Sequence, residues 1–258
     1  MPTFAFNNAT LYFEEEGQGS PLILLHGLTQ DIETLVYERE FLKPYFRVIS
    51  LDARGHGKSS KLSSYTLQDH VQDVIALMDH LGIEKASVMG NSLGSYIAQG
   101  VTVAVPHRVE KLVLVVPKAH GKTSSMQEMF HRYAEELVGM DSQQQLTHLT
   151  KYMFYDPIAV GKALKQWEEK GTVLSPEQQV AANKALEGFD YRPELHKVEA
   201  KTLVISGQHD GLNPPERGKE VASFIPNATF VLFEKSGHAP VIEEKDRFKQ
   251  VVTDFLTK

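Results

Sequence analysis

The sequence predicts an α/β protein with a mainly parallel sheet that is covered by helices on both faces. In the first half of the chain, short β-branched runs alternate with amphipathic helical stretches, as in βαβ units. The runs "PLILL" and "KLVLVV" are apolar throughout, which is typical of strands buried on both faces. After Pro117 the strands give way to helical stretches and return only near residue 202. This change predicts a helical insertion within the core.

The elements follow one another in a regular order. The stretch "YTLQDHVQDVIALMDHLGI" predicts a helix in which Thr66 is the N-cap, Asp69 completes a capping box and Gly82 ends the helix. A second helix begins at Ser92, a third surrounds residues 216–224, and a last one covers about 246–256. We expect the first two strands to pair as an antiparallel edge hairpin. The expected strands are residues 4–7, 10–15, 22–25, 47–51, 86–89, 112–116, 202–206 and 229–233.

The predicted insertion spans residues 121–195 and divides a core domain made of residues 1–120 and 196–258. Asp156–Pro157 and Ser175–Pro176 each place a capping side chain before a proline, which indicates two helix starts. Long structureless loops are uncommon in compact domains. We therefore expect the insertion to be a helical lid.

Composition excludes several classes of function. The chain has 258 residues, of which 41% are hydrophobic and 23% charged, and its net charge is −6. Its basic residues are scattered, which argues against a nucleic-acid partner. The chain contains no cysteine, which rules out disulfides and a thiolate nucleophile. There is neither a signal-peptide pattern nor an apolar run of the ~20 residues that cross a membrane. We expect a cytoplasmic protein without membrane contact; its oligomeric state stays open.

The sequence "MGNSLG" places Ser92 between two glycines, after a predicted strand and before a predicted helix. This is the context in which G-x-S-x-G forms a sharp turn that exposes a nucleophilic serine. The following helix directs its free N–H groups and positive dipole end toward the hydroxyl. An ordinary glycine-bounded turn would give the same five letters, so the interpretation depends on partner residues.

Two such partners lie after predicted strands. His238 in "EKSGHAP" follows the strand at 229–233, and Asp210 in "ISGQHDG" follows the strand at 202–206. A serine hydroxyl needs a base to remove its proton, and the base needs a carboxylate to fix its tautomer. The order Ser92, Asp210, His238 is the order found in α/β-hydrolases. We predict these three residues to be catalytic.

Acyl transfer also needs donors for the oxyanion that forms during the reaction. The backbone N–H of Leu93, directly after the serine, is one candidate. The N–H of Leu28, in the loop that follows "PLILLHG", is the other, and His26 is a candidate to brace this loop. This chemistry requires no cofactor, and we predict no metal site.

With these residues in place, the chain resembles the α/β-hydrolase superfamily over nearly all of its core. The matching segments are "LLHG" at 24–27, "LDARGHGKSS" at 51–60, "MGNSLG" at 89–94, "ISGQHDGLNPP" at 205–215 and "SGHAPVIEEKDRF" at 236–248. The resemblance implies an eight-stranded sheet, cofactor-free acyl transfer and a structural role for residues 52–59. Ser95 departs from the pattern, since many relatives have a second glycine there. A serine nucleophile argues against the haloalkane dehalogenase and epoxide hydrolase branches.

The expected activity is hydrolysis of a small, mainly apolar carboxylic ester or lactone. Aromatic and methionine side chains of the insertion indicate an apolar pocket, and Met126, Phe130, Phe154 and Trp167 are the candidates to line it. Residues of this kind at helical spacing also build the core of a lid. Two other functions stay open. One is hydrolysis of a carbon–carbon bond in a ring-cleavage product; the other is ligand binding or signalling without catalysis.

Overall fold

The computed structural model describes residues 2–258, so Met1, the first residue of the predicted core domain, lies outside it. Within these residues the strands form one eight-stranded sheet with the order β1-β2-β4-β3-β5-β6-β7-β8. The β1–β2 and β2–β4 pairs are antiparallel, and the other pairs are parallel. The strands are β1 (Thr3–Phe6), β2 (Ala9–Glu16), β3 (Pro21–Leu25), β4 (Arg47–Leu51), β5 (Ala86–Asn91), β6 (Val109–Val115), β7 (Lys201–Gly207) and β8 (Ala228–Phe233).

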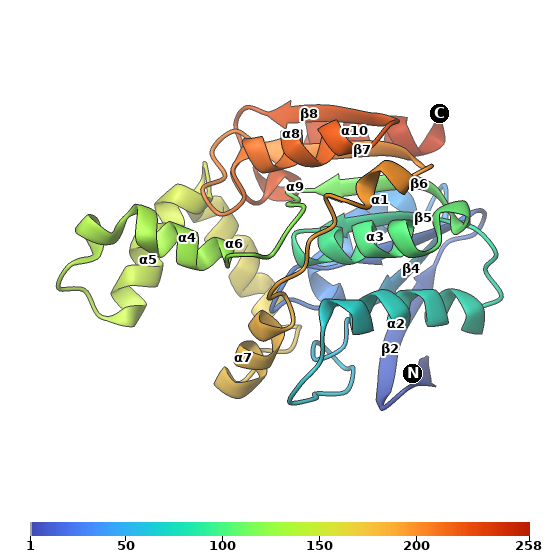
Figure 1. Ribbon diagram of the computed structural model, residues 1–258, viewed down its shortest axis with the longest axis horizontal. Helices are drawn as coiled ribbons and strands as arrows, with labels where there is room; N and C mark the ends of the chain where they lie inside the picture. The colour runs from blue at the N-terminus through green and yellow to red at the C-terminus, as the bar shows by residue number, and fades with distance from the viewer. Residues whose placement is uncertain (1) are drawn as a thin grey trace.

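Helices cover both faces of this sheet (Figure 1). On one face, α2 (Leu67–His80), α3 (Leu93–Ala104) and α8 (Pro215–Phe224) bury apolar side chains in a first hydrophobic cluster. On the other, α1 (Val36–Leu42) and α10 (Lys245–Thr257) contribute to a second cluster. The predicted two-sided parallel sheet is therefore confirmed, and the apolar runs of β3 and β6 are buried as expected.

Local signals place most helices where the sequence predicts them. The hydroxyl of Thr66 accepts a hydrogen bond from the N–H of Asp69, whose carboxylate accepts one from the N–H of Thr66, so the capping box of α2 is present. The structure adds two α-helices that the sequence analysis does not predict, α1 and the short α9 (Pro240–Glu243). A 3₁₀ turn at Ile32–Leu35 leads into α1, and Asp31 caps the turn by accepting from the N–H of Glu33.

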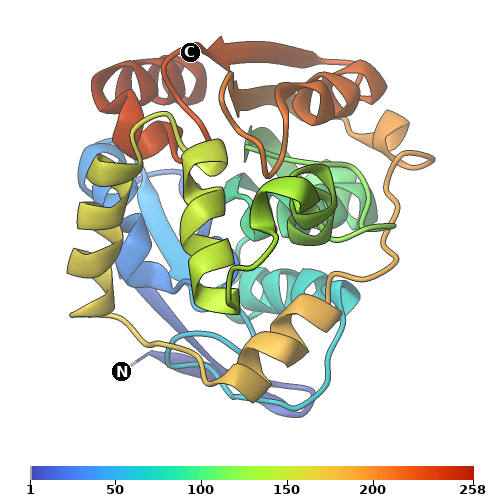
Figure 2. The same cartoon turned by 90° about the vertical axis from the view of Figure 1, so that its left-hand side faces the viewer.

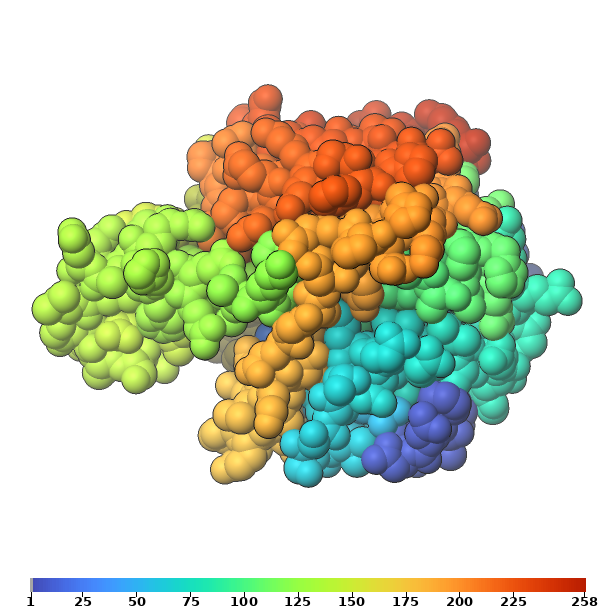
Figure 3. Space-filling view, viewed as in Figure 1, coloured from blue at the N-terminus to red at the C-terminus, as the bar shows by residue number. Residues whose placement is uncertain are grey.

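Between β6 and β7 the described chain forms four α-helices: α4 (Ser125–Arg132), α5 (Ser142–Met153), α6 (Pro157–Glu168) and α7 (Pro176–Lys184). The predicted caps at Asp156 and Ser175 are confirmed, since each side chain accepts from the backbone N–H three residues ahead. The arrowheads of β6 and β8 point toward these helices (Figure 1), and α4 and α5 project from the body of the molecule (Figure 3). Figure 2 looks onto this side.

Candidate active site

Ser92 lies on a tight turn between β5 and α3. Its backbone has φ 51° and ψ −113°, a region that costs a non-glycine residue about 1–3 kcal/mol. The flanking glycines make the turn possible: a Cβ at Gly90 would strike the carbonyl oxygen of Gly94, and a Cβ at Gly94 would strike that of Leu25. The sequence therefore forms a strained corner that presents the serine side chain at the start of a helix.

His238 and Asp210 lie beside this serine. The Nε2 atom of His238 is 3.0 Å from the Oγ atom of Ser92, and its Nδ1 atom is 2.7 Å from Oδ2 of Asp210. In the neutral tautomer that donates its Nδ1 proton to the carboxylate, Nε2 can accept the proton of the hydroxyl, which is the arrangement a general base requires. The structure thus brings the three predicted residues into one hydrogen-bonded line.

The loop after β7 fixes the carboxylate of Asp210. Its Oδ1 atom accepts hydrogen bonds from the N–H groups of Leu212 (2.9 Å) and Asn213 (2.8 Å), and the residue is 2% exposed. These bonds leave Oδ2 for the imidazole. The orientation of the acid is therefore set by the backbone of its own loop.

Asn213 is a buried residue of this site that the sequence analysis does not single out. Its side-chain amide donates to the hydroxyl of Tyr96 (2.7 Å) and to the carbonyl of Val116 (2.8 Å), and its oxygen accepts from Ser125 (2.7 Å). Burial is the largest of the effects that raise the pKa of Tyr96 to about 12. The phenol therefore stays protonated. The signal in the sequence is the asparagine three residues after Asp210.

The loop after β3 lies against the first turn of α3. Within it the Nε2 atom of His26 accepts from the N–H of Ala53 (3.0 Å), and its Nδ1 donates to the carbonyl of Gly27 (2.8 Å). The N–H of Gly27 donates to the side chain of Gln30 (3.0 Å). Burial lowers the pKa of His26, which keeps the imidazole neutral as these two bonds require. The loop is braced as the sequence predicts.

The two predicted oxyanion donors belong to these segments. Leu93 is the first residue of α3, and the first N–H groups of a helix have no partner within it. Leu28 is half-buried in the braced loop. Their role as donors stays a prediction.

Comparison with known proteins agrees with this geometry. The model of the family described as the alpha/beta hydrolase fold matches residues 20–245. The chain belongs to this family. It is 28% identical over 264 residues to the 2-hydroxy-6-oxo-6-phenylhexa-2,4-dienoate hydrolase of Comamonas testosteroni, a match that covers 95% of this chain and 91% of the relative.

Two solved structures are also similar over nearly their whole length. The enol-lactonase of Burkholderia xenovorans LB400 is 26% identical with a TM-score of 0.82, and each chain is covered completely. A thermophilic esterase of Thermogutta terrifontis is 28% identical with a TM-score of 0.80, covering 96% of this chain and 93% of the other. The chain is accordingly a hydrolase of the α/β-hydrolase family.

The "DARGHGKS" segment of this hydrolase shapes the core. Arg54 forms a bidentate ion pair with Asp73 in α2 at 2.6 and 2.9 Å, and both side chains are almost completely buried. The hydroxyl of Ser59 donates to the carbonyl of Asp52 and accepts from the N–H of Tyr12. These contacts support the structural role that the resemblance implies.

The candidate pocket residues lie at different places in the insertion. Met126 and Phe130 pack against a small cluster that α4 and α5 form with Met129 and Leu149, so their observed contacts are those of an internal core. Phe154 lies beside the histidine loop, which is the segment 234–239 that carries His238. Its Cα is close to Gly237. Trp167 is half-buried in α6. That these four residues line a substrate pocket stays a prediction.

Other features of residues 2–258 complete the description of the surface. A cavity of about 450 Å³ on the insertion is lined by Met140, Gln143, Gln144, Thr147 and His148 and includes none of the three triad residues. In the part of the chain that the structure describes, no three His, Asp or Glu side chains form a group suited to a metal ion. None of the described helices is both long enough and apolar enough to cross a membrane.

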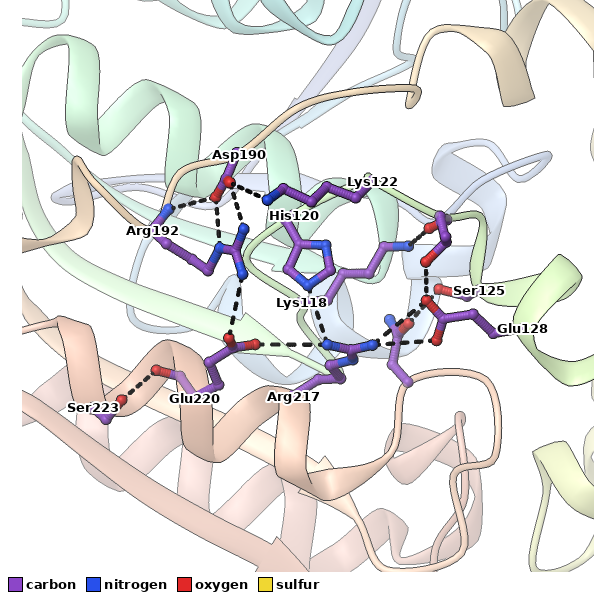
Figure 4. A network of polar contacts seen from close by, with 12 residues as sticks. Lys118, His120, Lys122, Ser125, Glu128, Asp190, Arg192, Arg217, Glu220 and Ser223 are labelled. Atoms are coloured by element: carbon purple, nitrogen blue, oxygen red, sulfur yellow. Dashed lines mark hydrogen bonds and ion pairs between the residues drawn. The ribbon is translucent and has the colours of Figure 1, made fainter. Parts of the chain in front are cut away.

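The two connections of the insertion pair with each other and with α8. The N–H of Tyr191 donates to the carbonyl of Ala119 (2.9 Å), and the N–H of Gly121 donates to that of Phe189 (2.7 Å). Arg217 of α8 contacts His120 at 3.1 Å and Glu128 of α4 at 3.3 Å (Figure 4). The insertion is thus attached to α8, the helix that directly follows the loop carrying Asp210.

Proposed function

We propose that this chain is a serine hydrolase that cleaves a small, mainly apolar carboxylic ester or lactone through an acyl-enzyme. The observation that carries the proposal is the continuous contact from Asp210 through His238 to Ser92, at 2.7 and 3.0 Å. A serine on a strained turn with an imidazole nitrogen at its hydroxyl is arranged for nucleophilic attack.

The reaction has two steps. Ser92 Oγ attacks the carbonyl carbon while its proton moves to His238 Nε2, and the N–H groups of Leu28 and Leu93 stabilise the oxyanion. The imidazolium then gives its proton to the leaving alkoxide, which leaves an acyl-serine. In the second step His238 removes a proton from water, the hydroxide attacks the acyl carbon, and the released serine oxygen takes the proton back. Asp210 stabilises the imidazolium in both steps.

The helical insertion, residues 121–195, is the proposed lid of this site. It supplies the half-buried residues Met153 and Phe154, whose backbones lie against Gly237, next to His238. The remaining proposed pocket residues, Met126, Phe130 and Trp167, would extend the same apolar surface. The proposed partner is therefore a small-molecule substrate with an apolar acyl or alkyl group.

Hydrolysis of a carbon–carbon bond is the second candidate. A relative that is 28% identical is named for such a 2-hydroxy-6-oxo-dienoate substrate, and Asn91 before the serine is common in that branch. Against it stands Ala239, at the position after the histidine where that branch often has tryptophan. The same triad would serve both reactions, so substrate tests have to separate them.

The test uses p-nitrophenyl esters of increasing acyl length, a series of lactones and a 2-hydroxy-6-oxo-dienoate whose absorbance is lost on cleavage. We expect an initial burst of p-nitrophenol, covalent labelling by a fluorophosphonate, and loss of both in a folded Ser92→Ala variant. Residual turnover within about tenfold of wild type would remove Ser92 from the mechanism. A folded wild type that neither labels nor cleaves any substrate would support ligand binding without catalysis instead.

A further inference from the structure

The junction between α5 and α6, residues 152–156, contacts both loops that carry the predicted catalytic acid and base. The carbonyl of Tyr152 accepts a hydrogen bond from the N–H of Gly211 (2.8 Å), and the carbonyl of Met153 accepts one from the N–H of His238 (2.7 Å). A Cβ at Gly211 would strike the first carbonyl, and a Cβ at Gly237 would strike the second. The backbones therefore approach each other closely at two points.

Glu243 links the α5–α6 junction to the loop that carries His238. Its Oε1 atom accepts from the N–H groups of Tyr155 (2.6 Å) and Asp156 (2.9 Å). Its Oε2 atom accepts from those of Gly237 (2.8 Å) and Ala239 (3.2 Å), the two neighbours of His238. Hydrogen bonds to a carboxylate are about twice as strong as neutral ones. One side chain thus binds two N–H groups of the insertion and two of the histidine loop.

The neighbouring Glu244 has a different set of contacts. It accepts from the N–H of Lys235 (2.8 Å) and the hydroxyl of Ser236 (2.9 Å), and it pairs with Arg247 (3.0 Å). Lys235 and Ser236 follow β8, and Arg247 lies in α10, so none of these partners belongs to the insertion. Two adjacent glutamates therefore hold the same loop, and only Glu243 has hydrogen bonds to the insertion.

We propose that Glu243 is a positioning residue that fixes the α5–α6 junction to the histidine loop and so keeps His238 aligned between Ser92 and Asp210. The proposal rests on the serine-hydrolase function proposed above. It assigns to the insertion a part in catalysis, because the α5–α6 junction holds the backbone of His238 in place. Glu243 itself touches none of the three triad side chains in the contacts described, so its effect passes through backbone.

The decisive variant is Glu243→Gln. A carboxamide has one accepting oxygen, and its NH₂ group would face N–H donors, so one of the two N–H pairs loses its acceptor in either orientation. Glu243→Asp keeps the charge but is one methylene shorter, and it carries the same test at smaller amplitude if the glutamine variant does not fold. Glu244→Gln loosens the loop without touching the junction. Asp246→Asn, three residues away, controls for the loss of one negative charge.

Two measurements need no substrate. We expect hydrogen exchange in segments 152–156 and 236–240 to accelerate about 10-fold or more in Glu243→Gln, with the β-sheet amides unchanged. We also expect the strongly downfield proton of the His238 Nδ1–H bond to Asp210 to weaken or broaden in its NMR spectrum. In Glu244→Gln the exchange change should stay within residues 234–240.

The kinetic measurement uses the best ester of the substrate panel. We expect kcat of Glu243→Gln to fall about 10- to 100-fold with KM within about threefold of wild type, since a displaced catalytic group lowers turnover more than binding. A kcat of Glu243→Asp between those of Glu243→Gln and wild type would support the positioning role of Glu243. Unchanged kcat, or unchanged exchange at residues 152–156, would overturn it, as would an equal loss in Asp246→Asn. If wild type cleaves no ester, the proposed function fails, while exchange and the downfield proton still decide the role of Glu243.

Discussion

Replacement of His26 by alanine should destabilise the fold and impair the loop that carries Leu28. The imidazole is 1% exposed and holds two backbone groups, the N–H of Ala53 and the carbonyl of Gly27. Alanine removes both partners. An unpaired buried polar group costs about 1–3 kcal/mol, so two such groups cost about 2–6 kcal/mol. A water molecule entering the vacated space would bind both groups partly, which favours the lower half of this range.

The first measurement is urea unfolding of wild type and His26→Ala at neutral pH. The second is ester turnover without urea, at a temperature where both proteins are folded. A loss of about 2–4 kcal/mol is a large fraction of the 5–15 kcal/mol that stabilises a typical domain. Since removal of an oxyanion donor costs about 10²–10³ in turnover, a displaced loop should lower kcat by up to that factor.

His107→Ala is the matched control, because this histidine lies in the 3₁₀ turn that follows the C-terminal end of α3 and is not buried. It should change the free energy of unfolding by less than about 0.5 kcal/mol. A loss below about 1 kcal/mol in His26→Ala, or a loss equal to that of the control, would refute the bracing role of His26.

Three further predictions test other parts of the structure. Arg54→Met should cost about 3–5 kcal/mol in urea unfolding, because it leaves the buried carboxylate of Asp73 unpaired; a cost below about 1 kcal/mol would contradict this. Asp210→Asn should lower kcat by roughly 10⁴ with little change in KM, since the amide would donate to Nδ1 and leave Nε2 protonated; near-normal turnover would contradict it. Burial lowers the pKa of His56 from 6.5 to about 3, so between these values the unfolded chain binds more protons and stability falls as pH falls. Burial raises the pKa of Glu38 to about 7, which acts in the opposite direction, so wild type is compared with His56→Asn. Below pH 6.5 the free energy of unfolding of wild type should fall by about 1.4 kcal/mol more per pH unit than that of the variant. Parallel pH profiles would refute this.

The strands, the nucleophile turn and the triad candidates are readable from the sequence because their signals are local. An apolar run followed by a chemically distinctive residue locates the carboxyl end of a strand, as for Asp210 and His238. Parallel strands bring such ends to one edge of the sheet, where the structure places both side chains next to Ser92.

Helix α1 shows why one element is missed. Its sequence "VYEREFL" has three charged residues in the middle, yet two of them, Glu38 and Arg39, are buried. Arg39 pairs with Glu14 of β2 at 2.5 Å, a partner 25 residues earlier in the chain. Hydrophobic periodicity cannot anticipate a charge that is neutralised from such a distance.

Glu243 illustrates a second kind of limit. All four of its partners are backbone N–H groups, and every residue except proline has one. No residue type in either segment therefore marks the contact. Met126 and Phe130 show a related limit, since an apolar side chain on an amphipathic helix looks the same whether it packs on a neighbouring helix or faces a substrate.

The attachment of the insertion at residues 119–121, 152–156 and 189–191 has a consequence for protein engineering. Exchanging the whole segment with that of a relative would displace the backbone carbonyls that accept from the N–H groups of Gly211 and His238 wherever the new α5–α6 junction follows a different path. Grafts confined to the outer faces of α4 and α6 would keep these acceptors. A chimera with grafts only on the outer faces of α4 and α6 should retain turnover while its substrate selectivity changes. A chimera with the whole insertion exchanged should fold but have a lower kcat.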